Sequence, residues 1–137
     1  MKTLLAVLVI STISLVSSSE FKYKGKPLEQ LIEARNKCFV SENVDASYLD
    51  KLDQIEYPTR DEIQCHTYCV LSSFKIINDK GEVFPEIVMK YIKEPVQQKL
   101  VIDTINTCIL RTKKSENACD RAHQMQACFN SIIYKKN

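Results

Sequence analysis

The feature that most constrains this 137-residue chain is its set of six cysteines. They stand at positions 38, 65, 69, 108, 119 and 128, so the first 37 residues contain none. An even number of cysteines in an oxidising compartment predicts disulfides, which here means three. Three cross-links in so short a chain restrict the fold to arrangements that bring distant segments into contact.

The N-terminus indicates the compartment. Residues 1–19 have the three parts of a secretory signal, namely Lys2, an apolar stretch over residues 4–16, and three small serines over residues 17–19. The apolar stretch is too short to span a bilayer comfortably. We therefore expect a signal peptide over residues 1–19, one domain over residues 20–137, secretion into extracellular fluid, and no stable membrane insertion.

The composition and the hydrophobic pattern favour helices. Two glycines and four prolines are too few for an all-β fold with many tight turns. Apolar residues recur with helical period. Pro58 ends any helix before it, and the Thr59–Glu62 capping box and Ser115 mark the starts of two others. The pattern predicts helices over residues 27–40, 45–52, 60–78, 85–93 and 95–112, and a sixth from the Ser115 cap to residue 133. The predicted fold class is all-α, with about six helices.

The third predicted helix is apolar on two sides. Ile63 and Val70 share one face, Cys65 and Cys69 lie nearly opposite, and Tyr68 belongs to a narrow polar stripe that we expect to be exposed. A helix with two apolar faces needs neighbours on both sides. We expect it to run through the middle of the domain.

Helix geometry limits the disulfide pairing without deciding it. Six cysteines allow 15 connectivities. Cys119 and Cys128 are roughly 13 Å apart along one helix, beyond the span of about 7 Å that a disulfide allows. Cys65 and Cys69 are one turn apart, so each should reach a different neighbouring helix. Several pairings remain open, and a simple hairpin of the last two helices would favour Cys108 with Cys119.

The spacing of the cysteines resembles that of the insect odorant-binding protein family, including the pheromone-binding proteins. The gaps between successive cysteines are 26, 3, 38, 10 and 8 residues. Cys65-x3-Cys69 and Cys119-x8-Cys128 are the two fixed spacings most diagnostic of that family. The resemblance implies an interlocked pairing, which replaces the hairpin pairing: Cys38 with Cys69, Cys65 with Cys119, and Cys108 with Cys128.

The resemblance also implies a function. Members of the family pack their helices around an internal apolar cavity that binds small hydrophobic molecules without covalent chemistry. The resemblance therefore implies a carrier of odorants, pheromones or lipid-like ligands, with no enzyme activity and no cofactor. A chemosensory receptor is a second candidate partner, and we expect a monomer or a weak dimer. The alternative is a secreted signalling protein with a filled helical core, as in venom, saliva or seminal fluid.

The candidate binding residues are apolar side chains on the inward faces of the last four predicted helices and in the short C-terminal tail. They are Phe74, Val88, Met89, Ile105, Met125, Phe129, Ile133 and Tyr134. Ile132, Ile133 and Tyr134 continue the inward face of the last helix, so we expect the tail to cover the cavity. Among the tyrosines, Tyr134 is the one we expect to offer its hydroxyl to a ligand oxygen.

Other classes of function lack the residues they need. A formal net charge of +2 indicates no polyanionic partner, so nucleic-acid binding is not expected. The chain has only two histidines and no Gly-x-Ser-x-Gly, so no catalytic set is found. A zinc site could be imagined from Cys65, Cys69, Cys119 and His123. Oxidised cysteines cannot act as thiolate ligands, and His123 is expected on a polar face beside Asp120 and Asn130, so no metal site is predicted.

His66 is the one titratable side chain at the edge of the predicted apolar stripe. The favoured interpretation is an ordinary boundary histidine. The alternative is a pH trigger, in which ligand affinity falls between about pH 7 and pH 5 because a charge develops beside the apolar wall.

Overall fold

The computed structural model describes residues 5–6, 9–10, 26–112, 115 and 117–134. Its helices, in chain order, are α1 Lys26–Ser41, the 3₁₀ helix η1 Ala46–Lys51, α2 Arg60–Ile63, α3 His66–Ser73, α4 Pro85–Val88, the 3₁₀ helix η2 Met89–Tyr91, α5 Pro95–Arg111 and α6 Ala118–Ile133. Two short strands, β1 Leu5–Ala6 and β2 Val9–Ile10, pair antiparallel within the predicted signal peptide. The all-α fold class is confirmed for the domain.

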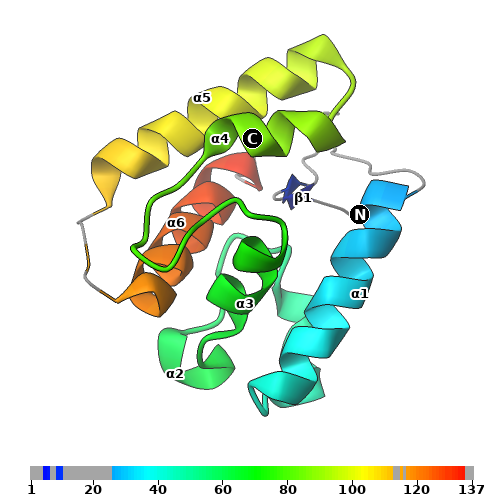
Figure 1. Cartoon of the computed structure of the whole chain (residues 1–137), viewed down its shortest axis with the longest axis vertical. Coiled ribbons are helices and arrows are strands. Elements are labelled where there is room, and N and C mark those ends of the chain that lie inside the picture. Colours follow the sequence, from blue (N-terminus) through cyan, green and yellow to red (C-terminus); the bar gives the residue numbers. More distant parts are fainter. Residues whose placement is uncertain (1–4, 7–8, 11–25, 113–114, 116, 135–137) are drawn as a thin grey trace.

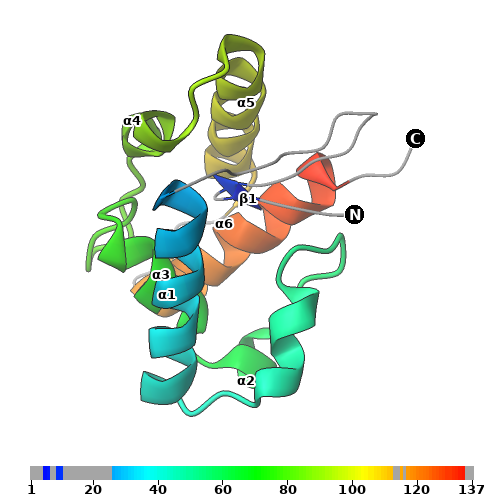
Figure 2. The same cartoon turned by 90° about the vertical axis from the view of Figure 1, so that its right-hand side faces the viewer.

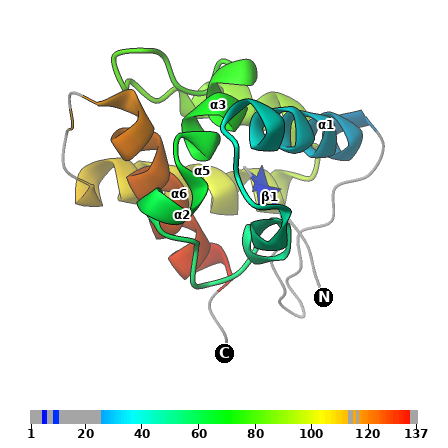
Figure 3. The same ribbon diagram turned by 90° about the horizontal axis from the view of Figure 1, so that it is seen from below.

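The helices are arranged around α3 and α6. Figure 1 shows α1 on one side of the molecule and α5 on the other, with α3 and α6 between them. The main packing contacts are α3 on α6, α5 on α6, and α1 on α3. Figure 2 shows α4 beside α5, and Figure 3 shows α6 crossing α5. In the part of the chain that the structure describes, no helix is long and apolar enough to cross a bilayer.

Local capping explains where several helices begin. The hydroxyl of Thr59 accepts a hydrogen bond from the Glu62 N–H at 3.2 Å, and the Glu62 carboxylate accepts one from the Thr59 N–H at 2.9 Å. This capping box was predicted, and it starts α2. Glu94 caps α5 by accepting from the Gln97 N–H at 2.8 Å. The predicted fourth helix forms as α4 followed directly by η2, and it ends at Tyr91.

The predicted continuous helix over residues 60–78 is wrong. The chain leaves helical geometry at Gln64, which has a positive φ of 49°, and again at Lys75, with a φ of 63°. The break separates α2 from α3, so Ile63 is buried while Cys65 reaches α6. Tertiary contacts thus override a helical pattern that looks continuous in the sequence. The predicted central position of α3, between α1 and α6, is confirmed.

The start of α6 also differs from the prediction. Its N-cap is Asn117, whose side-chain oxygen accepts from the N–H groups of Cys119 at 2.8 Å and Asp120 at 3.1 Å. Ser115 instead accepts a hydrogen bond from the Asn117 N–H at 3.1 Å. Serine and asparagine are both good N-cap residues, so preference alone does not separate them. The later start places Cys119 in the first turn, facing Cys65.

Three disulfides join the helices in the interlocked pairing that the family resemblance implied. They are Cys38–Cys69, Cys65–Cys119 and Cys108–Cys128, with Cα–Cα distances of 5.8, 5.1 and 5.8 Å. The first ties α1 to α3, the second ties the start of α3 to α6, and the third ties α5 to α6. The hairpin pairing of Cys108 with Cys119 is excluded, since α6 crosses α5 and meets it at Cys128.

Buried apolar side chains form two separate clusters. The main cluster lies among α3, α4, α5 and α6, and consists of Leu71, Ile76, Ile77, Val88, Ile92, Val101, Ile105, Cys108, Ala122, Met125, Phe129 and Ile133. The second cluster lies between α1 and α3 and consists of Leu31, Cys38 and Val70. Half-buried Phe74 packs against both clusters. It therefore marks the boundary between the two parts of the interior.

Candidate functional site

The main cluster brings together most of the predicted binding residues. Val88, Ile105, Met125, Phe129 and Ile133 are all at most 6% exposed and belong to this one cluster. They come from α4, α5 and α6, whose inward faces were predicted from helical period. These five buried side chains belong to one packed cluster, and we call them the apolar wall.

Two predicted aromatic side chains lie at the edge of the wall. Phe74 meets Tyr91 edge to face, with ring centroids 5.5 Å apart and an interplanar angle of 79°. The Tyr134 ring packs against the main cluster, and its hydroxyl donates to Asp53 Oδ1 at 3.5 Å. The hydroxyl of Tyr134 thus faces a carboxylate rather than the apolar wall. The prediction that it is directed at a ligand oxygen is not supported by this geometry.

Met89 lies apart from the other predicted residues. Its side chain is 39% exposed, and it is not part of the main cluster. The predicted helix over residues 85–93 would have placed Met89 beside Val88 on a long amphipathic face. The chain instead tightens into the 3₁₀ helix η2 at Met89, which changes the direction of its side chain.

Sequence reasoning missed several residues of the cluster. Leu71, Ile76, Ile77, Ile92 and Val101 are buried there and were not among the candidate binding residues. Tyr68, which we expected to be exposed, is half-buried and packs against the same cluster. The prediction treated residues 60–78 as one continuous helix and therefore placed Tyr68 on the exposed face. The break at Gln64 changes the register of α3, so that placement was wrong.

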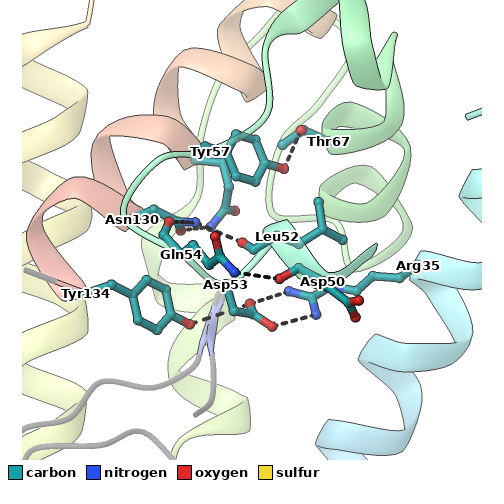
Figure 4. A network of polar contacts seen from close by, with 10 residues as sticks. Arg35, Asp50, Leu52, Asp53, Gln54, Tyr57, Thr67, Asn130 and Tyr134 are labelled. Carbon is teal, nitrogen blue, oxygen red and sulfur yellow. Dashed lines mark hydrogen bonds and ion pairs between the residues drawn. The ribbon is translucent and has the colours of Figure 1, made fainter. Parts of the chain in front are cut away.

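A polar network closes the interior near the end of α6 (Figure 4). The guanidinium of Arg35 donates to both carboxylate oxygens of Asp53, at 2.7 and 3.0 Å. Asn130 Nδ2 donates to the backbone carbonyls of Leu52 at 2.8 Å and Gln54 at 2.9 Å. Together with Tyr134, these residues tie α1, the segment after η1 and α6 to one another.

Asn130 corrects the prediction that it lies on a polar face. The residue is fully buried, at 0% exposure, and its side-chain oxygen accepts from Gln126 Nε2 at 2.9 Å. A buried amide is stable only where its donors and acceptors are paired, and here the backbone after η1 supplies the acceptors. No pattern in the α6 sequence alone reveals a partner more than 70 residues away.

The charged and phenolic groups of this region have shifted pKa values. Burial lowers the pKa of Arg35, but the adjacent Asp53 carboxylate outweighs that effect, so the pKa is raised overall. Burial raises the pKa of Tyr57 to about 12, although its hydroxyl lies 2.7 Å from the Thr67 hydroxyl. Arg35 is therefore charged and Tyr57 neutral at every physiological pH.

His66 lies deeper than the predicted boundary position. It is 1% exposed, its Nε2 donates to the Arg35 carbonyl at 3.1 Å, and its ring centroid is 4.3 Å from that of Phe39. Burial lowers its pKa to about 4. A small cavity of about 20 Å³ adjoins it, lined by Leu31, Arg35, Leu52, Tyr57, His66, Thr67, Val70, Leu71 and Gln126. His66 thus stays neutral over most of the range from pH 7 to 5, which does not favour the alternative of a pH trigger.

His123 is half-buried rather than on an open polar face. Its Nε2 donates to the Pro58 carbonyl at 2.7 Å, and its ring lies 5.3 Å from that of Tyr57. Burial lowers its pKa. All six cysteines are in disulfides, and among the described residues no three His, Cys, Asp or Glu side chains are grouped to hold a metal ion.

Known proteins are similar to this chain in sequence and in fold. The model of the PBP/GOBP family matches residues 22–131, and the chain belongs to this family. Its sequence is 23% identical over 106 residues to general odorant-binding protein 69a of Drosophila melanogaster, covering 77% of this chain and 70% of that protein. It is 22% identical over 120 residues to odorant-binding protein 22 of Aedes aegypti, covering 88% and 86% of the two chains.

The fold also matches a solved structure. An odorant-binding protein of Locusta migratoria superposes with a TM-score of 0.64 at 19% sequence identity, covering 80% of this chain and 83% of that chain. At this identity the match supports the fold alone. The family resemblance inferred from the cysteine spacing is therefore confirmed by the family model, and the solved structure confirms the fold.

Proposed function

We propose that this protein is a secreted carrier that binds small hydrophobic molecules and transports them in extracellular fluid. The ligand contacts the apolar wall of Val88, Ile105, Met125, Phe129 and Ile133 and is held by burial of its apolar surface. No catalytic step and no cofactor enter this proposal. Odorants, pheromones and other lipid-like compounds are the ligand class, consistent with the names of the relatives.

The observation that carries the proposal is the divided interior. A domain of this size usually buries one main apolar core with smaller satellite clusters beside it. Here the main cluster and the cluster of Leu31, Cys38 and Val70 are separate, and the ring of Phe74 is half-buried between them. An apolar ligand lying against Phe74 completes the burial that the protein leaves incomplete. Each disulfide between helices stabilises the folded state by about 3 to 4 kcal/mol. This stabilisation offsets the incomplete burial of apolar surface.

The test is binding of N-phenyl-1-naphthylamine, a neutral apolar fluorophore, to the disulfide-bonded protein. We expect binding with a dissociation constant of about 1 to 10 µM, which is typical of a small ligand held by apolar contacts. Medium-chain alcohols and esters should displace the fluorophore. Native mass spectrometry of protein purified from its source would identify the natural ligand.

Two variants make the test specific to the wall. Phe129→Ala should weaken binding about fivefold or more, since it removes apolar contact area from the wall. Val40→Ala is the matched control, because Val40 is 83% exposed on α1 and touches no part of the wall. Correctly oxidised, helical protein that takes up no apolar probe would refute the carrier. The signalling alternative with a filled core would then be favoured.

A further inference from the structure

The small cavity beside His66 lies among α1, α3, α6 and the segment after η1, and none of the five wall residues lines it. Its volume of about 20 Å³ exceeds the roughly 10 to 15 Å³ that one water molecule needs. Four lining side chains are apolar and five carry polar groups, namely Leu31, Leu52, Val70 and Leu71, and Arg35, Tyr57, His66, Thr67 and Gln126. This size and lining suit one small polar group.

His66 gives this cavity an unpaired hydrogen-bond acceptor. The side chain is 1% exposed, and its Nε2 lies 3.1 Å from the Arg35 carbonyl oxygen, which can only accept. Nε2 therefore carries a hydrogen, and because burial lowers the pKa of the ring to about 4, Nδ1 carries none. Nδ1 is buried and has no hydrogen-bond partner among the described residues. A buried acceptor of this kind costs stability unless a donor reaches it.

Tyr57 and Thr67 give the same cavity a hydroxyl hydrogen to donate. Their two oxygens lie 2.7 Å apart, and either hydroxyl can be the donor. Figure 4 shows the two hydroxyls directed at each other. Since one of the two hydrogens is used in that bond, the other is left for a further acceptor. The cavity thus presents one acceptor and one donor, which a single hydroxyl group can satisfy together.

The cavity lies at the boundary between the two apolar clusters. Leu71 lines the cavity and belongs to the main cluster, whereas Leu31 and Val70 line it and belong to the second cluster. Phe74, which packs against both clusters, follows Val70 by about one helical turn, or about 6 Å. One end of a ligand that lies against Phe74 is therefore close to the cavity.

We propose that this cavity binds the hydroxyl group of the ligand, so that the carrier selects alcohols among apolar molecules. The ligand hydroxyl donates to His66 Nδ1 and accepts from the pair of Tyr57 and Thr67. Its chain extends past Leu71 to Phe74 and the apolar wall. Aldehydes, esters and hydrocarbons have no hydrogen to donate, so they leave Nδ1 unpaired.

This inference rests on the proposed function, because it names the class of ligand that the carrier takes. A water molecule offers the same donor and acceptor as an alcohol. The two sources differ in one respect that can be measured. Only a ligand hydroxyl in the cavity makes the affinity for an alcohol depend on His66 and on the hydroxyl pair.

Two ligands with the same chain test the site. They are 1-decanol and 1-fluorodecane, in which fluorine replaces the hydroxyl and cannot donate. Displacement of N-phenyl-1-naphthylamine from the disulfide-bonded protein gives the dissociation constant of each. We define the alcohol preference as the constant of 1-fluorodecane divided by that of 1-decanol, so that the contribution of the common chain cancels. His66→Leu removes the acceptor and should lower this preference about fivefold or more.

The double variant Tyr57→Phe with Thr67→Val removes the donor and tests the site a second time. It replaces two bonded hydroxyls by apolar groups of nearly the same shape, so the fold should persist even if His66→Leu does not fold. The alcohol preference should fall about threefold or more. Tyr48→Phe is the matched control. The Tyr48 hydroxyl lies 3.3 Å from the Glu62 carboxylate, outside the cavity, so the preference should stay within about twofold.

The outcomes separate this site from the carrier function on which it rests. If the unchanged protein binds no fluorophore, the carrier and the hydroxyl site are both refuted. If the fluorophore binds but the folded variants keep the alcohol preference of the unchanged protein, only the hydroxyl site is overturned, and the cavity holds water at most. A Tyr48→Phe variant that loses as much preference as the double variant also overturns the site.

Discussion

The two ends of α6 are held in different ways. At its N-terminal end the helix is tied covalently to the start of α3 by Cys65–Cys119, and Arg60 Nε lies 2.7 Å from the Asp120 carboxylate. Beyond Cys128 its C-terminal end is held by hydrogen bonds, chiefly those of Asn130 to the segment after η1. The N-terminal end is thus tied covalently to α3, whereas the C-terminal end has a covalent bond to α5 at Cys128 and only noncovalent contacts beyond it.

This difference indicates where the interior can be entered. Phe129 and Ile133 of the apolar wall lie at the hydrogen-bonded end, where each directly precedes a residue of the polar network, Asn130 or Tyr134. For the proposed carrier, we expect a ligand to reach the wall when that end opens, while the disulfide keeps α3 and α6 together. Ligand exchange would then need no global unfolding. The predictions below separate the two ends, beginning with the largest expected effect.

Replacing the pair by Cys65→Ala with Cys119→Ala should lower the free energy of unfolding by about 4 kcal/mol, as the entropy of a 54-residue loop predicts. Hydrogen exchange should increase most in the first turns of α6. The Cys38–Cys69 bond closes a 31-residue loop, so Cys38→Ala with Cys69→Ala should cost nearly as much, yet leave exchange in α6 unchanged. Faster exchange at the C-terminal end of α6 in the first variant would contradict the division between the ends.

Acid should act on the hydrogen-bonded end through His66. Its pKa is lowered from 6.5 to about 4, so between these values the unfolded chain binds more protons than the folded one. Stability therefore falls as the pH decreases through this window, by up to about 3 kcal/mol, and levels off below it. The Arg35 carbonyl that accepts from His66 belongs to the residue that holds Asp53, so the polar network should loosen first.

Urea unfolding at several pH values measures this dependence. His66→Gln keeps a donor for the Arg35 carbonyl but cannot titrate, so it should remove most of the dependence between pH 6.5 and about 4. His123 is the internal comparison, since burial lowers its pKa as well but the ring is only half-buried. A pH profile unchanged in His66→Gln would assign the acid sensitivity to other groups.

The cysteines and the helical period predicted the outline of this fold. The cysteine spacing identified the family and, through it, the pairing of all three disulfides. The inward faces of α5 and α6 were predicted from the helical repeat of apolar residues, which depends only on local geometry. Phe129, Ile105 and Met125 were found for this reason, since each lies well inside a long, regular helix.

The remaining features depend on contacts between distant segments. The break at Gln64 and the short η2 at Met89 arise where tertiary packing overrides helical preference, and they displaced Tyr68 and Met89 from their predicted environments. The burial of Asn130 depends on carbonyls of Leu52 and Gln54, which no local pattern connects to α6. The polar network could be found only once the three segments were placed together.

Asn130→Ala should have an intermediate effect. It leaves the carbonyls of Leu52 and Gln54 without their donor and should cost about 2 kcal/mol of stability. Asn130→Asp has nearly the same shape but puts a carboxylate against two carbonyls, so it should cost more than the alanine variant. Gln124→Ala, at an exposed position of the same helix, should change stability by less than about 0.5 kcal/mol. If thermal unfolding shows that Asn130→Asp is more stable than Asn130→Ala, then the amide donor is not what stabilises this end of α6.

The smallest effect is expected from Tyr134→Phe. The hydroxyl of Tyr134 lies 3.5 Å from Asp53, longer than an ordinary hydrogen bond, so its removal should cost about 0.5 kcal/mol or less. Tyr134→Ala also removes the ring that packs against the main cluster and should cost about 1 to 2 kcal/mol. It should also speed the release of N-phenyl-1-naphthylamine in stopped-flow measurements, whereas Tyr134→Phe should not. If Tyr134→Phe speeds release as much as Tyr134→Ala does, the hydroxyl rather than the ring keeps this end of α6 closed.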